Sequence, residues 1–364
     1  MSDNFIMQMR PWFGEEEKIA ITEYMDEGGF LTEFKRTEKF ESMIAAYTKS
    51  KHCIVVNNGT ISLTLAAIAL DIKAGDEVIV PNYTMVATPN SIKMFGAKPV
   101  FVDVEKETLC LDINLVEKAI TRKTKAIMLV SANGRYPLSG IKMFEDLCKS
   151  HNIKLIEDSA QSLGSFYPDG RHIGTAGLVG SFSFSMPKII STGQGGALVT
   201  DDDEIASRLR KLKDFGRTGG GNDLHDTIGF NFKFTELQAC IGIEQMKKLS
   251  KRVEIKKLLF KKYYEQLSDI NGIKLFDHNL DLTAPWFIDC KAESRDKLIM
   301  HLKEHNIGSR VMYPPLNKQK AYDEEDDHLI SNNIGREGLW LPSYAQLTDN
   351  EISHITSTIR DFYK

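Results

Sequence analysis

The feature that most constrains the fold is an alternation of short apolar runs with helical patterns between about residues 50 and 200. The runs predict strands at Cys53–Val56, Glu77–Pro81, Lys98–Val104, Ala126–Val130, Lys154–Asp158 and Gly180–Ser185. Several runs are almost continuously apolar, as expected when helices cover both faces of a parallel sheet. Helical patterns lie between them, for example at Thr60–Leu70, Val86–Phe95 and Ile141–Ser150. This order predicts a doubly wound α/β architecture.

The pattern changes beyond about Gly242. A long charged helical stretch, MKKLSKRVEIKKLLFKKYYEQL, leads into shorter strands and helices that end at Lys364. We therefore predict a large α/β domain over residues 1–242 and a small α+β domain over residues 243–364. Lysines dominate the long helix, but glutamates interrupt it and the whole chain is acidic. A solvated amphipathic face is therefore favoured over a membrane or nucleic-acid surface.

Composition limits the classes of partner. The 364 residues include 46 basic and 50 acidic side chains, a formal charge of −4, so no strong field favours nucleic acid or an anionic membrane. No apolar stretch approaches the roughly 20 residues that span a bilayer, and the start lacks the pattern of a signal peptide. Five scattered cysteines without CxxC spacing are typical of free thiols in a reducing compartment. The sequence therefore predicts a cytoplasmic protein.

Polar residues collect where three of the predicted strands end. The strand KLIED continues into SAQ, which places Asp158 and Gln161 at its carboxyl end. Another strand runs into SFSFSMPK, which delivers Ser183 and Lys188 and is followed by the glycine-rich STGQGG. A third reads VVNNGT and opens directly into a helix at Thr60. In open α/β sheets, functional groups gather at such strand ends.

These strand ends match the parts that pyridoxal phosphate (PLP) requires. The cofactor's aldehyde needs a lysine amine, and Lys188 is the candidate. Its pyridine nitrogen needs a carboxylate, such as Asp158, so that the protonated ring acts as an electron sink. Its phosphate needs backbone N–H groups at a helix N-terminus and hydroxyl donors, which the turn at Gly59 and Thr60, with Ser183, would supply.

Each of these patterns alone has an ordinary structural explanation. A lysine after a strand is usually a surface residue, an aspartate there is more often a turn or cap residue, and NNGT is a common turn before a helix. Their joint occurrence, in this order within one α/β segment, favours a cofactor site.

Two further patterns are set aside. His301 and His305 share a helix face, but HLKEH lacks the HExxH glutamate and no third ligand is apparent, so no metal is predicted. A glycine cluster lacks the lysine and spacing of a P-loop and is interpreted as a loop that closes over substrate. Its members are Gly216, Gly219, Gly220 and Gly221.

The chain also resembles the DegT/StrS sugar aminotransferases, which are fold-type I PLP enzymes. The resemblance spans nearly the whole length, and the perosamine-synthase-like branch looks similar. The matching segments are GFLTEFKRTEKFE, NNGTISLTLAA, GDEVIVPNYT, GAKPVFVDV, TKAIM, IEDSAQSLGS, FSFSMPK with TGQGGALVTDD, GFNFKFTELQACIG and SRVMYPPL. The most specific are IEDSAQ and the spacing from FSF to the lysine. The resemblance implies an aspartate-aminotransferase-like large domain with a mostly parallel sheet and a smaller C-terminal α+β domain.

The resemblance also implies roles for single residues. Lys188 would form the Schiff base with PLP, Asp158 would pair with the pyridinium nitrogen, and Gln161 would lie against the ring hydroxyl. The phosphate would be held by Ser183, Gly59 and Thr60. Asn231, in GFN, resembles the asparagine that reaches the phosphate of the neighbouring subunit, which implies a homodimer with shared active sites.

The chain departs from the family pattern at several places. Met85, in NYTMVAT, stands where the family usually puts an aromatic ring over the cofactor, and a thioether can still pack on a π-face. The family's HLYG reads SANG here, GEGG reads GQGG, and a late histidine is replaced. The residues concerned are Ser131, Asn133, Gln194 and Asn317. These regions are expected to touch substrate, so they leave the identity of the sugar open.

The resemblance implies an aminotransferase that moves an amino group from glutamate to a nucleotide-linked keto-sugar. A 4-keto-6-deoxy hexose is expected, for amino-sugar and polysaccharide biosynthesis such as lipopolysaccharide O-antigen. The nucleotide, and whether carbon 3 or carbon 4 is aminated, stay open. Relatives that act as sugar dehydratases carry histidine in place of the lysine, so Lys188 favours amino transfer. A PLP-fold regulatory or binding protein without turnover is the remaining alternative.

Overall fold

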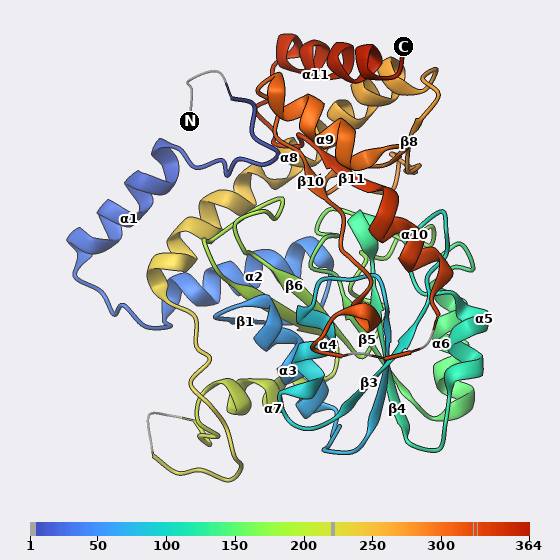
Figure 1. Ribbon diagram of the computed structural model, residues 1–364. Helices are drawn as coiled ribbons and strands as arrows, with labels where there is room; N and C mark the ends of the chain where they lie inside the picture. Colours follow the sequence, from blue (N-terminus) through green and yellow to red (C-terminus); the bar gives the residue numbers. More distant parts are fainter. Residues whose placement is uncertain (1–4, 220–222, 323, 326) are drawn as a thin grey trace.

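The structure is a computed structural model that describes residues 5–219, 223–322, 324, 325 and 327–364 (Figure 1). Of the glycine cluster, Gly220 and Gly221 lie outside these residues. The large sheet has seven strands in the order β1-β7-β6-β5-β4-β2-β3. Their bounds are His52–Val56 (β1), Glu77–Pro81 (β2), Lys98–Val102 (β3), Thr124–Val130 (β4), Lys154–Asp158 (β5), Val179–Ser183 (β6) and Gly196–Thr200 (β7).

Neighbouring strands of the large sheet are parallel except at β7, which runs antiparallel to both β1 and β6. The predicted α/β fold with a mostly parallel sheet is confirmed. All six predicted strands are present, with ends that differ by at most two residues. Strand β7 was not among them, because its chain segment follows β6 after an irregular connection rather than after a helix. That connection carries Lys188 and reverses the chain direction.

Helices cover both faces of this sheet, because successive strand residues point to opposite sides. Along β1, Ile54 and Val56 join the core under α3, whereas Cys53 and Val55 join the core under α2. One face is covered by α3 (Gly59–Ala69), α4 (Ala87–Lys93) and α7 (Asp203–Lys213). The other is covered by α2 (Lys35–Thr48), α5 (Ile113–Ala119), α6 (Ile141–His151) and the first half of α8 (Glu236–Leu267).

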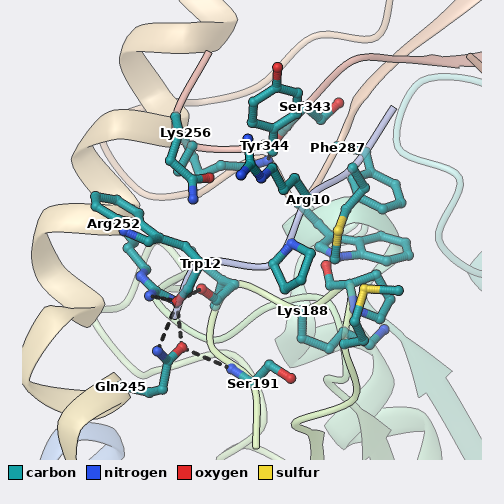
Figure 2. Close-up of a pocket in the computed structure, with 18 residues that line it drawn as sticks. Arg10, Trp12, Lys188, Ser191, Gln245, Arg252, Lys256, Phe287, Ser343 and Tyr344 are labelled. Carbon is teal, nitrogen blue, oxygen red and sulfur yellow. Dashed lines mark hydrogen bonds between the residues drawn. The ribbon is translucent and has the colours of Figure 1, made fainter. Parts of the chain in front are cut away.

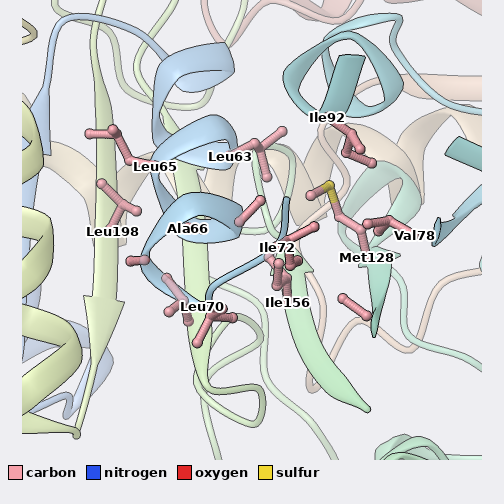
Figure 3. Packing of buried hydrophobic residues seen from close by; sticks show 14 of the residues in the cluster. Leu63, Leu65, Ala66, Leu70, Ile72, Val78, Ile92, Met128, Ile156 and Leu198 are labelled. Atoms are coloured by element: carbon pink, nitrogen blue, oxygen red, sulfur yellow. The ribbon is translucent and has the colours of Figure 1, made fainter. Parts of the chain in front are cut away.

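Helix α3 lies at the centre of the first core (Figure 3). It is apolar almost all round, with buried residues on every side, which is typical of a helix enclosed between a sheet and other helices. Leu63 and Ala66 of α3 pack with Met128 of β4 and Ile156 of β5 in the same cluster. The N-terminus of α3 is thereby held close to the carboxyl ends of neighbouring strands.

The C-terminal part of the chain forms a small antiparallel sheet in the order β10-β11-β9-β8. The strands are Ile273–Leu275 (β8), Ile288–Ala292 (β9), Arg310–Val311 (β10) and Gly338–Leu341 (β11). Its core includes residues of α9 (Arg295–Glu304), α11 (Asp349–Phe362) and the second half of α8. The remaining α-helices are α1 (Glu15–Glu27), which packs on α8, and α10 (Leu329–Glu337).

Helix α8 belongs to both parts of the molecule (Figure 1). Residues from Ala239 to Val253 pack into the large-sheet core, and residues from Leu259 to Leu267 pack into the small-sheet core. The boundary predicted after residue 242 falls within this helix, and the division into two domains stays a prediction. Among the helices of the described residues, none is both long and apolar enough to cross a membrane.

Candidate active site

A cavity of about 390 Å³ opens where β5 and β6 end and α3 begins. Seven of the eight residues predicted to bind PLP lie on its wall, and Asn231 does not. The lining residues come from several strand ends and from the C-terminal domain. They are Asn57, Asn58, Gly59, Thr60, Leu63, Thr84, Met85, Ala87, Asp158, Ala160, Gln161, Ser183, Ser185, Pro187, Lys188, Gln194, Trp286, Arg310 and Tyr313.

The start of α3 forms a cradle for an anion on this wall. Asn58 caps the helix, its side chain accepting from the N–H of Ile61 at 2.9 Å. The N–H groups of a first helical turn have no partner within the helix, and they attract negative charge. A Cβ at Gly59 would lie 2.8 Å from Cβ of Ser183, so only glycine lets the helix come this close to β6. The donors at Gly59, Thr60 and Ser183 fit the phosphate of PLP.

Asp158 lies at the buried end of β5 and is 5% exposed. Its Oδ2 accepts from the hydroxyl of Thr88 at 2.7 Å, and its Oδ1 accepts from the N–H of Ala160 at 3.2 Å. Burial raises the pKa of Asp158, and these two hydrogen bonds and the charge of Lys188 oppose the rise. No cation of the described residues forms an ion pair with it at contact distance. A protonated pyridine nitrogen would supply the missing positive charge.

Lys188 lies on the same cavity wall, in the connection between β6 and β7. Burial lowers the pKa of Lys188 to about 8, and the charge of Asp158 opposes the shift. An amine with such a pKa is partly neutral near physiological pH, as a nucleophile and general base must be. The Nζ atom lies over the ring of Trp286, 4.2 Å from its centroid.

Two more of the predicted residues, Gln161 and Met85, line the cavity and could contact a cofactor ring there. The amide oxygen of Gln161 accepts from the N–H of Asn133 at 2.6 Å, so the amide nitrogen is left to donate to a ring oxygen. Met85 is 45% exposed on the cavity wall, and its sulfur accepts from the N–H of Ala87 at 3.0 Å. A thioether held there can pack on the face of a ring.

The residues that depart from the family pattern do not all reach the cavity. Gln194 is on the wall, whereas Ser131, Asn133 and Asn317 are buried away from it. Asn317 binds inside the protein, its Oδ1 accepting from the side chain of Asn82 at 2.9 Å. All four positions were expected to touch substrate. Only Gln194 lines the cavity and is placed to do so.

Sequence reasoning missed several residues around the lysine. Trp286, Arg310 and Tyr313 reach the cavity from the C-terminal domain, far along the chain from the strand ends. The segment SRVMYPPL matches the family pattern but does not by itself indicate a role for Arg310 or Tyr313. Arg310 is exposed and makes no ion pair with a carboxylate of the described residues, so its guanidinium is available to an acidic ligand.

A second cavity, of about 40 Å³, lies behind Lys188 (Figure 2). Two cations of α8 line it, Arg252 at 4% exposed and Lys256 at 6% exposed, so these two side chains lie on the buried side of the helix and not on its solvated face. The N-terminal segment covers Arg252, which donates to the carbonyl of Trp12 at 2.6 Å. Burial lowers the pKa of Lys256 to about 7, and its amine donates to the carbonyl of Ser343.

The fold and this cavity define a PLP-dependent enzyme of the α/β class: an amine, a buried carboxylate and an anion cradle converge at strand ends. Residues 12–360 match the DegT/DnrJ/EryC1/StrS aminotransferase family, and the chain belongs to this family. The predicted family, enzyme class and PLP cofactor are thereby confirmed: the protein is an aminotransferase that uses PLP.

Named relatives are similar over the full length. The chain is 33% identical to a GDP-perosamine synthase of Vibrio cholerae, covering 97% of this chain and 98% of that protein. It is 33% identical to a GDP-perosamine synthase of Escherichia coli O157:H7, covering 99% of both. Among solved structures, S. venezuelae DesV in complex with a ketimine intermediate superposes with a TM-score of 0.90 at 32% identity, over 96% of this chain and 95% of that chain. The PMP form of the putative sugar aminotransferase Spr1654 from Streptococcus pneumoniae superposes with a TM-score of 0.92 at 25% identity. The match covers 98% of this chain and 97% of that chain.

Replacing the buried carboxylate tests its role. Asp158→Asn should still bind PLP, because the phosphate cradle is intact, but it should lose about a hundredfold or more in turnover, since a neutral amide does not stabilise the protonated ring. Each factor of ten corresponds to ~1.4 kcal/mol of barrier. Absorbance of bound PLP gives binding, and 2-oxoglutarate formation from glutamate gives turnover. Near-wild-type turnover would contradict the role of Asp158.

The lowered pKa of Lys188 makes a prediction about pH. Only the neutral amine attacks the aldehyde of PLP, so capture of PLP by cofactor-free protein should accelerate about tenfold per pH unit below pH 8 and level off above it. Stopped-flow absorbance measures the rate, with a free lysine derivative as the control for the titration of PLP itself. A rate that keeps rising to pH 10.5 would show that Lys188 is not shifted.

Proposed function

We propose that the protein transfers the amino group of glutamate to the carbonyl carbon of a nucleotide-linked keto-sugar, a 4-keto-6-deoxy hexose. The observation that carries the proposal is the full-length similarity to two GDP-perosamine synthases, in a chain whose cavity keeps Lys188. We further propose that the amino sugar enters polysaccharide biosynthesis, such as that of lipopolysaccharide O-antigen, and that the enzyme acts in the cytoplasm.

The residues of the cavity suit both halves of such a reaction. PLP, when bound, supplies an electron sink that stabilises negative charge on the carbon next to the amine. Asp158 would keep the pyridine nitrogen protonated, and Gln161 would donate to the ring oxygen. Lys188 would hold the cofactor covalently at rest, and its freed Nζ would act as the base that takes the α-proton of the donor and as the acid that returns a proton. In the second half the same Nζ would move protons in the opposite direction, with the sugar as the acceptor.

The exposed guanidinium of Arg310 supports an acidic donor. It lines the cavity together with Tyr313, and it packs over the ring of Trp340 at 5.6 Å from the centroid. Arg310 thus has an anchored side chain and a free hydrogen-bonding edge. We assign it to a carboxylate of glutamate, because Arg binds carboxylates in a two-pronged geometry.

A homodimer with shared sites is part of the proposal. Asn231 is exposed and off its own cavity wall, so it is available to a second chain. Large apolar side chains are exposed in the same region and in the segment that precedes α2, which pairs with it through a bridge between Thr32 and Thr235. They include Phe30, Leu31, Phe34, Leu224, Ile228 and Phe230. Apolar surface gathered in this way favours contact with another protein, here a second copy.

A panel of keto-sugars tests the proposed reaction. The PLP-loaded protein with glutamate should form 2-oxoglutarate and an amino sugar from one nucleotide-linked 4-keto-6-deoxy hexose in preference to 3-keto sugars. Mass spectrometry identifies the sugar product. Lys188→Ala is the control, and it should bind PLP but form no amino sugar.

Other outcomes of the panel would replace the proposal. Formation of a deoxygenated sugar would indicate a dehydratase. Failure to form 2-oxoglutarate with any sugar would indicate a binding or regulatory protein. Borohydride treatment of wild type should fix the cofactor to a peptide containing Lys188, and a label on any other lysine would disprove the site.

Subunit mixing tests the shared site. A Lys188→Ala chain paired with an Asn231→Ala chain has one site with both lesions and one site with neither, if Asn231 serves the neighbouring site. Two individually impaired proteins should therefore regain up to about half of the wild-type activity per mixed dimer after exchange. Mixing would restore nothing if Asn231 acted within its own chain, and a monomer at working concentration would also contradict the proposal.

A further inference from the structure

The backbone on both sides of Lys188 is held by side chains from distant parts of the sequence. On one side, the indole N–H of Trp286 donates to the carbonyl of Pro187 at 2.6 Å. On the other, Arg252 of α8 donates to the carbonyl of Ile189 at 3.1 Å. The two carbonyls belong to the residues immediately before and after the lysine, so the position of its Cα is fixed from the C-terminal domain and from α8.

Of Trp286 and Arg252, only Trp286 is recorded in contact with the side chain of Lys188 among the described residues. Its ring lies 4.2 Å from Nζ, measured to the centroid, and both residues line the main cavity. Trp286 is 4% exposed, so its ring has little freedom of its own. A single side chain thus contacts the loop backbone through its N–H and the reactive amine through its face.

The position of Trp286 is itself set by a clamp on the next residue. Asn133, with φ of 54°, uses its side chain to accept from the N–H of Phe287 at 2.6 Å and to donate to the carbonyl of Phe287 at 2.8 Å. The backbone N–H of Asn133 donates to Gln161. The ring of Phe287 stacks on Trp286 at 3.9 Å between centroids. Asn133 therefore links the side chain of Gln161, through the backbone and ring of Phe287, to the indole of Trp286.

We propose that Trp286 is a positioning residue for Lys188, holding the lysine loop through its N–H and the free amine through its ring face. The inference rests on the function proposed for Lys188. Once the donor has displaced the lysine, its four-carbon side chain is free to rotate, and proton transfer requires Nζ to stay close to one carbon. The electron-rich face of the indole attracts the ammonium that forms when Nζ takes the proton.

Two variants separate the two contacts. Trp286→Phe keeps an aromatic face but removes the N–H, and Trp286→Leu removes both. In a single turnover of the PLP-loaded enzyme with glutamate, Trp286→Phe should react about 10- to 100-fold more slowly, because small misplacements of a reacting group have costs of this order. The glutamate concentration at half-maximal rate and the Kd for PLP should stay within about threefold of wild type. The residues proposed to bind glutamate and PLP are unchanged in this variant.

The pH profile provides a readout that a packing role would not change. The linings of its two cavities give the charged groups near Nζ. They are Asp158 from β5, Arg310 from β10, Arg252 and Lys256 from α8, and Arg10 from the N-terminal segment, and the tyrosines are Tyr313 and Tyr344. All remain in both variants. Removing the ring removes an attraction for the ammonium, so Trp286→Leu should lower the apparent pKa of the single-turnover rate by roughly one pH unit. Trp286→Phe should shift it by less than half as much.

Trp340→Phe is the matched control. Trp340 packs against Trp286 with ring centroids 5.8 Å apart and is equally buried, but it hydrogen-bonds to neither Pro187 nor the lysine. Trp340 also packs under Arg310, so the comparison is made at saturating glutamate, where glutamate affinity no longer limits the rate. Under that condition the single-turnover rate and pH profile of Trp340→Phe should resemble wild type. A wild-type rate in Trp286→Phe would overturn the proposal, and so would an equal loss in Trp340→Phe or a parallel loss of PLP affinity. Borohydride labelling of wild type distinguishes a failure of the proposed function from a failure of this inference. A label on a lysine other than Lys188 would disprove the proposed function, whereas a label on Lys188 together with a wild-type rate in Trp286→Phe would disprove only the role of Trp286.

Discussion

The site depends on one physical constraint: the carboxylate of Asp158 is buried at the end of a central strand, and no cation of the described residues contacts it. Two neutral donors, Thr88 and the N–H of Ala160, hold it in place but do not neutralise its charge. A buried carboxylate in this state is costly unless a positive partner arrives or the group takes up a proton. The site thus suits a cationic ring. Burial raises the pKa of Asp158 and lowers the pKa of Lys188, and the charge of each residue opposes the shift of the other.

The sequence predicted those parts of the site that lie at strand ends, because a parallel sheet brings such ends together whatever their separation along the chain. Asp158, Ser183 and the turn at Gly59 are of this kind, and each is next to an apolar run that is easily recognised. Strand β7 was missed because it breaks the alternation of strand and helix. The close packing of Gly59 against Ser183 explains a glycine that the sequence alone showed only as a turn residue.

The residues that the sequence did not predict belong to the C-terminal domain or to the buried side of α8. Arg252 and Lys256 occur in a run of lysines that is typical of a solvated helix face. Their burial depends on tertiary contacts, with the N-terminal segment at Trp12 and with the carbonyl of Ser343. No local pattern carries that information. Trp286 is hidden for the same reason, since nothing near it in the sequence indicates that its N–H meets a carbonyl about a hundred residues earlier.

Asn133 shows how a departure from the family pattern can act without touching a ligand. The family pattern HLYG has other residues in this turn, whereas here an asparagine adopts a left-handed conformation, which this residue tolerates better than most. Its side chain satisfies both backbone groups of Phe287, and its own N–H satisfies Gln161. These contacts join the turn after β4 to the segment that leads into β9, and Asn133 does not line the cavity, so its side chain acts through the backbone of Phe287 rather than by touching a ligand.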